Sequence, residues 1–139
     1  MVILGLNLTH IEARKTGPLN PEMKITSGLQ ILDTTLAKKH SKELPEVMKV
    51  DLEYTVDYPE CANIKLKGTL NFTDANQDLK KMEKDFKKEK KLPLEIKTPI
   101  YNHALYKFTI KALSLAEELN LPAHIRLPFV EPAEKQDSK

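Results

Sequence analysis

The chain has 139 residues, of which 40% are hydrophobic and 30% charged, and its formal net charge at pH 7 is +2. This composition is typical of a folded domain and excludes a disordered chain, and no apolar run is long enough to cross a membrane. Lysine supplies 20 of the 22 basic residues, and this scarcity of arginine argues mildly against a nucleic-acid reader.

The length and the end of the chain predict its domain organisation. We expect one domain over residues 1–130 and a disordered polar tail over residues 131–139. A single cysteine, Cys61, excludes an internal disulfide and favours a reducing, cytoplasmic location.

The first expected strand begins at Val2. Apolar side chains alternate from Val2 to Leu8 and then change phase to Ile11 and Ala13. A change of phase would turn the following side chains to the wrong face, so we predict a bulge near His10. This alternation also indicates that the N-terminus is part of the fold rather than a signal peptide.

A turn over residues 17–21 separates this strand from the next. The second expected strand has alternating apolar residues from Met23 to Ile31, and residues 33–45 are predicted to form a charged connection. Residues 49–58 and 63–72 then alternate most clearly, which predicts an antiparallel hairpin whose acidic and lysine rows face each other. Together the four strands predict an antiparallel meander with one buried face.

Two helices are expected after the strands. Asp74 and Gln77 resemble a capping box before a short helix with the apolar stripe Leu79, Met82 and Phe86. Thr98–Pro99 is predicted to begin a long helix that ends near Asn120. Strands followed by helices indicate an α+β domain in which a short and a long helix pack on one face of the sheet.

The long helix carries apolar side chains on two sides. We expect one side to cover the sheet; it comprises Tyr101, Ala104, Leu105, Phe108, Ala112, Leu115, Ala116 and Leu119. The second side contains Tyr106, Ile110 and Leu113, with His103 nearby. Leaving these three large residues in water would forgo on the order of 5 kcal/mol. The short helix or a second copy of the chain can cover them, and we favour the second copy as an oligomer interface.

No catalytic, cofactor or metal site is expected. The four histidines (His10, His40, His103 and His124) and Cys61 do not stand at metal-ligand spacing, and four glycines build no phosphate loop. Lys80 to Lys91 holds seven lysines and three acidic residues, a net charge of +4 that could attract nucleic acid. The interspersed acidic residues favour a solvated helix face instead.

The order of these elements resembles the SecB-type chaperones, particularly their archaeal SecB-like relatives. The resemblance is carried by the hairpin KVDLEYTVDY/NIKLKGTLNF, the helix IYNHALYKFTIKALSLAEELNLP and the closing HIRLPFV, and it covers residues 1–130. It implies a homotetramer built as a dimer of dimers with the long helices in the middle. It also implies ATP-independent binding of unfolded polypeptides, in protein export or against aggregation, in apolar grooves beside the helices.

By location and apolar character, the groove residues implied by this resemblance are Phe72, Leu92, Leu94, Ile96, Tyr101, Leu127 and Phe129. Two features depart from the family. Bacterial SecB is markedly acidic, whereas this chain is near neutral, and the end of this chain, EPAEKQDSK, lacks the cysteines with which the bacterial tail binds zinc. Docking to a translocation motor is therefore not expected.

The resulting hypothesis is a cytoplasmic, non-enzymatic, oligomeric chaperone-like protein that binds unfolded or extended polypeptides and uses no cofactor. Two other classes stay open. A small oligomeric adaptor or regulatory protein would use the same surface for one specific partner. A nucleic-acid-binding protein would use Lys80 to Lys91.

Overall fold

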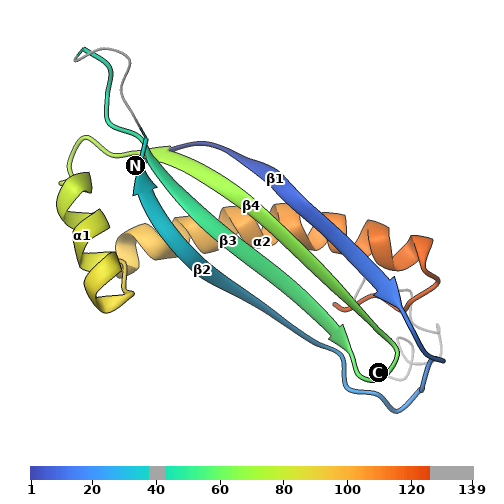
Figure 1. The fold of residues 1–139 in the computed structure, drawn as a ribbon. Helices are drawn as coiled ribbons and strands as arrows, with labels where there is room; N and C mark the ends of the chain where they lie inside the picture. Colours follow the sequence, from blue (N-terminus) through green and yellow to red (C-terminus); the bar gives the residue numbers. More distant parts are fainter. Residues whose placement is uncertain (38–42, 126–139) are drawn as a thin grey trace, which may run out of the picture.

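The structure, a computed structural model, describes residues 1–37 and 43–125. Its elements are the strands β1 (Val2–Lys15), β2 (Thr26–Leu36), β3 (Met48–Tyr58) and β4 (Ala62–Thr73) and the helices α1 (Leu79–Glu89) and α2 (Leu94–Glu118). The strands form one antiparallel sheet, and α2 lies across one of its faces (Figure 1). The predicted α+β class, an antiparallel sheet of four strands with a short and a long helix, is confirmed.

The predicted hairpin forms the centre of the sheet. β3 and β4 pair with Tyr54 opposite Leu66 and Glu53 opposite Lys67, and the Glu53 carboxylate lies 3.7 Å from the Lys67 ammonium. Every second residue of β3 is buried, as the alternating sequence predicted. One face of the hairpin therefore forms the core, while the other carries its charged rows.

The strand order is β1-β4-β3-β2, so β1 lies beside β4 rather than beside β2. The prediction of a simple four-stranded meander was wrong in this respect, because alternation shows which residues are strands but not which strands are neighbours. Residues 16–25 can reach up to ~33 Å when extended, whereas three inter-strand spacings total ~14 Å. The connection from β1 to β2 is therefore long enough to cross the whole sheet (Figure 1).

The edge strands are irregular. The bulge predicted near His10 is confirmed, because the register of β1 against β4 shifts between Leu8 and His10. β2 shifts against β3 after Ile31 and then continues to Leu36. The predicted charged connection from Asp33 to Pro45 therefore begins too early, because Asp33 to Leu36 still belong to β2. The bulge changes which side chains face the core, so that Thr34 is buried.

Both helices begin elsewhere than predicted. The N-cap of α1 is Asp78, whose carboxylate accepts a hydrogen bond from Lys81 N at 3.2 Å, whereas the predicted cap Asp74 forms a turn by accepting from Asn76 N. α2 begins at Leu94, so that Pro99 lies inside it instead of at its first position. Starting earlier buries Ile96 in the core, which offsets the backbone hydrogen bond that Pro99 lacks.

A single line of residues joins α2 to the sheet. Its buried residues recur every four positions and are Ile96, Ile100, Ala104, Phe108, Ala112 and Ala116. The Phe108 ring stacks on Tyr54 with centroids 5.8 Å apart. The alanines between the larger residues let the helix approach the strands closely, so the first apolar side covers the sheet as predicted, except at Leu105, which is exposed.

Candidate functional site

The second apolar side of α2 is open to solvent. Tyr106 is 74% exposed and Ile110 53%, while Leu113 is half-buried and His103 is exposed. These residues lie on the side of the helix opposite Phe108, because they are two or five positions from it along a period of 3.6 residues. Leu105, which was predicted to face the sheet, lies at the border of this surface and is 40% exposed. We call Tyr106, Ile110 and Leu113, with His103 beside them, the outer face of α2.

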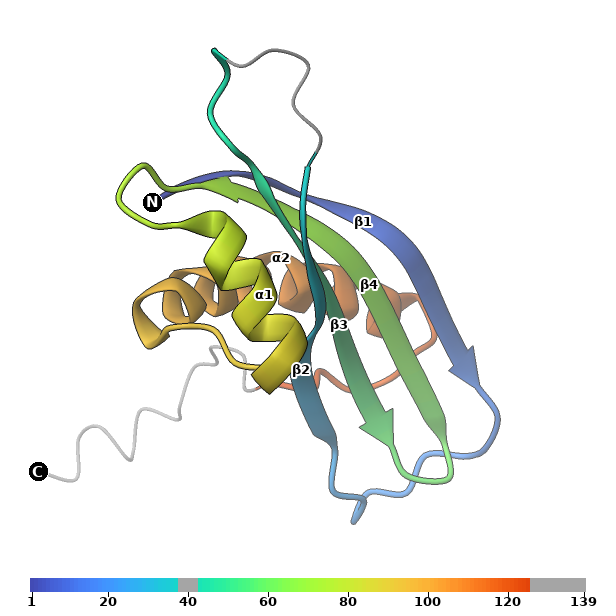
Figure 2. The same cartoon turned by 60° about the vertical axis from the view of Figure 1, so that its left-hand side comes forward.

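The short helix does not cover this face, so that alternative from the sequence was wrong. α1 lies against β2 at the edge of the sheet, close to the beginning of α2 (Figure 2). Its residues Leu79, Met82 and Phe86 are buried there. The apolar stripe of α1 is therefore already buried at the β2 edge of the sheet, and it leaves Tyr106 and Ile110 exposed.

A cavity of about 370 Å³ lies beside β2. It is lined by β2, the end of α1, the segment between the helices and the first turns of α2, through Gln30, Ile31, Phe86, Lys90, Lys91, Leu92, Leu94, Lys97 and Tyr101. We call it the β2 groove. Leu94 is 77% exposed within it.

The structure brings together only part of the predicted groove. Leu92, Leu94 and Tyr101 line the β2 groove. Phe72 and Ile96 are fully buried in the core and have no surface to offer a ligand. Leu127 and Phe129 lie outside the described residues, as does the predicted tail.

β2 is an edge strand, and two side-chain hydrogen bonds from described residues protect its outer edge near its end. Thr34 N donates to Asp33 Oδ1 at 2.9 Å, and Leu36 N donates to Glu83 Oε2 at 2.5 Å. Within residues 1–37 and 43–125, no comparable side-chain hydrogen bond reaches the backbone of Thr26–Ile31. That part of the edge offers unpaired backbone groups beside the apolar floor of the groove.

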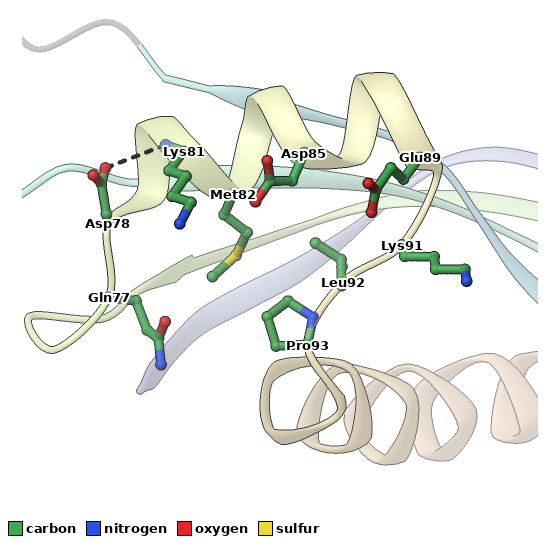
Figure 3. A pocket seen from close by; sticks show the side chains of 9 residues that line it. All are labelled: Gln77, Asp78, Lys81, Met82, Asp85, Glu89, Lys91, Leu92 and Pro93. Atoms are coloured by element: carbon green, nitrogen blue, oxygen red, sulfur yellow. Dashed lines mark hydrogen bonds between the residues drawn. The ribbon is translucent and has the colours of Figure 1, made fainter.

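A second, more polar cavity of about 500 Å³ lies between α1 and the segment that leads to α2. Asp85 and Glu89 extend from α1 toward this segment, and Lys81 and Met82 lie on the same side of the helix (Figure 3). Asp78, the nearest other acid, is engaged as the helix cap. In the described part of the chain no His, Cys, Asp and Glu residues converge in a group able to hold a metal ion.

The segment after α2 is fixed to β3 by two tyrosines, and no pattern in the sequence predicts this arrangement. Tyr54 Oη lies 2.8 Å from His124 Nε2, and Tyr58 Oη donates to the Pro122 carbonyl at 2.5 Å. Burial lowers the pKa of His124 and raises the pKa of Tyr58, the latter with contributions from Cys61 and Tyr54. Both groups are therefore held neutral, which suits anchoring rather than acid–base chemistry.

The lysines of α1 lie on its solvent side. Lys80, Lys81, Lys84, Lys87 and Lys88 are all exposed, opposite the buried apolar stripe. Among the described ion pairs, none involves a lysine of this helix. In the described ranges, no helix combines the length and apolar character needed to cross a bilayer.

Comparison with solved structures gives remote likenesses. The chain is similar to the Mycobacterium tuberculosis Rv1957 SecB-like chaperone, solved in complex with a ChAD peptide from the Rv1956 HigA1 antitoxin. The sequences are 15% identical, the likeness covers 93% of this chain and 90% of that one, and the TM-score is 0.46. Neither a family model nor a curated protein matches the chain. A likeness this remote transfers neither family membership nor function.

Proposed function

We propose that this protein is a non-catalytic, chaperone-like protein that binds extended, apolar segments of other polypeptides in the β2 groove. The observation that supports this most directly is the edge of Thr26–Ile31, which no described residue pairs on its outer side, next to the exposed side chain of Leu94. An extended chain can pair with such an edge through its backbone and place apolar side chains in the adjacent groove.

The two parts of this surface have complementary roles. Backbone pairing with β2 is independent of sequence, because every non-proline residue offers one N–H and one C=O. Ile31, Leu92 and Tyr101 form an apolar wall against which burial of apolar side chains is favourable. Such side chains are mostly buried in folded proteins and exposed in unfolded chains. Binding of this kind requires no bound nucleotide and no chemical step.

We also propose that a second copy of the chain covers the outer face of α2. Tyr106 and Ile110 are large apolar residues that their own chain leaves exposed. The same residues on a second copy would supply the matching surface, as in a two-fold interface. A dimer or a tetramer would bring several β2 grooves into one particle.

Suppression of aggregation tests the groove. A heat-aggregating model protein is followed by light scattering with wild-type protein, with Leu94→Asp, and with Leu19→Asp as the matched control. Leu19 is 45% exposed in the connection between β1 and β2, at the end of the sheet away from α1 (Figure 1). We expect Leu94→Asp to require about tenfold more protein for the same suppression, since a buried leucine contributes ~1.5–3 kcal/mol, whereas Leu19→Asp acts like wild type.

Failure of the wild-type protein to suppress aggregation at several-fold excess contradicts the proposed function. Capture of a single folded protein without any effect on aggregation supports the adaptor alternative instead. Retention on DNA or RNA that falls steeply with salt supports the nucleic-acid alternative through Lys80 to Lys91.

A further inference from the structure

All the charges on the described residues that line the β2 groove have the same sign. They belong to Lys90, Lys91 and Lys97, and within residues 1–37 and 43–125 no carboxylate lines the groove. Lys90 Nζ lies 5.6 Å from the centroid of the Phe86 ring, and Lys97 Nζ lies 5.2 Å from that of Tyr101. Lys90 and Lys97 are therefore each held against an aromatic side chain of the groove, with the ammonium group available to a ligand.

The acidic residues of α1 form no described ion pair with Lys90 or Lys97. Asp85 and Glu89 line the adjoining cavity under α1, which Lys91 also lines (Figure 3), and Glu83 accepts a hydrogen bond from Leu36 N. The charges that alternate along the sequence of α1 are thus separated in space, and the groove is left positive.

We propose that the β2 groove, given the polypeptide-binding function proposed above, selects extended segments that carry carboxylates next to apolar side chains. The apolar walls bind the apolar side chains, and Lys90 and Lys97 bind the carboxylates. A polypeptide fits better than a nucleic acid because the groove is bordered by the edge strand β2, and none of its described lining residues is an arginine. The class of client is therefore an acidic, unfolded segment.

Three short labelled peptides test this selection. They share the same apolar residues and differ only in whether their remaining positions are Glu, Gln or Lys. Fluorescence anisotropy at low salt should give a dissociation constant for the Glu peptide about tenfold below that for the Gln peptide, and the weakest binding for the Lys peptide, because several exposed ion pairs act together. This advantage of the Glu peptide should shrink at ~0.5 M salt, where charges are screened over a few ångströms.

Lysine variants locate the effect. The double variant Lys90→Gln/Lys97→Gln should remove the difference between the Glu and Gln peptides while it retains binding of the Gln peptide. The control Lys84→Gln/Lys88→Gln makes the same change of charge on the solvent side of α1 and should keep the tenfold difference. Lys84, Lys88 and Lys90 are exposed and Lys97 is half-buried, and circular dichroism verifies that both variants are folded.

The outcomes separate the two proposals. Equal affinity for the Glu and Gln peptides, or tighter binding of the Lys peptide, overturns the selection of acidic segments and leaves the polypeptide-binding function standing. No binding of any peptide overturns both. Tighter binding of a single-stranded oligonucleotide, with displacement of the Glu peptide, overturns the proposal in favour of nucleic acid.

Discussion

The imidazole of His124 links the segment after α2 to the sheet through its contact with Tyr54. Its other nitrogen, Nδ1, is buried and has no hydrogen-bond partner among the described residues. A protonated ring would carry an N–H at both nitrogens, so this environment disfavours the charged form. Burial accordingly lowers the pKa of His124 below its ordinary value of 6.5.

This shift predicts a pH dependence of stability. Because the pKa is lower in the folded state, the unfolded chain binds the proton first, and the free energy of unfolding falls as the pH drops below about 6.5 toward the folded pKa. The slope from this one group is at most ~1.4 kcal/mol per pH unit. Urea unfolding at several pH values should show the loss in the wild-type protein and a smaller loss in His124→Gln. An identical pH profile for the two proteins would contradict this role.

The contact of β1, β4 and α2 depends on a residue without a side chain. A Cβ added at Gly68 would lie 2.9 Å from the Asn7 carbonyl oxygen and 3.2 Å from Phe108 Cζ. Gly68→Ala should therefore lower the free energy of unfolding by ~1–3 kcal/mol through overpacking. Gly28→Ala in β2 is the matched control, since a Cβ there meets nothing within 4 Å; it should be neutral or slightly stabilising. Urea denaturation measures both, and equal effects of the two changes would contradict the role of Gly68.

The elements differ in how far the sequence predicts them. Alternating apolar residues identify β3 and β4 because both strands have one buried and one open face. The start of α2 is missed because Thr98–Pro99 is a local signal of a helix start, whereas the burial of Ile96 depends on the sheet. Local preference is weaker than tertiary packing here. The pairing of β1 with β4 is likewise a long-range contact, which the alternation of apolar residues does not predict.

At the scale of the whole molecule, both candidate surfaces arise from how one long helix sits on a narrow sheet. The sequence predicts the outer face of α2 because helical periodicity places Tyr106 and Ile110 together. It predicts the β2 groove only in part, because Ile31, Leu92 and Tyr101 come from three separate segments that only folding brings together. Phe72 and Ile96 were predicted to line the groove but are buried in the core. The sequence does not distinguish these two places, because both require an apolar residue.

The outer face of α2 predicts the state of assembly. Burying the large apolar residues of this face would contribute a free energy on the order of 5 kcal/mol for each chain. We therefore expect the wild-type protein to form a dimer or tetramer in light scattering coupled to size exclusion. The double variant Tyr106→Asp/Ile110→Asp should be a monomer with unchanged circular dichroism, because both side chains point away from the core. Leu19→Asp should assemble like wild type. A wild-type protein that stays monomeric at high concentration would contradict the proposed interface but not the proposed binding of polypeptides in the β2 groove.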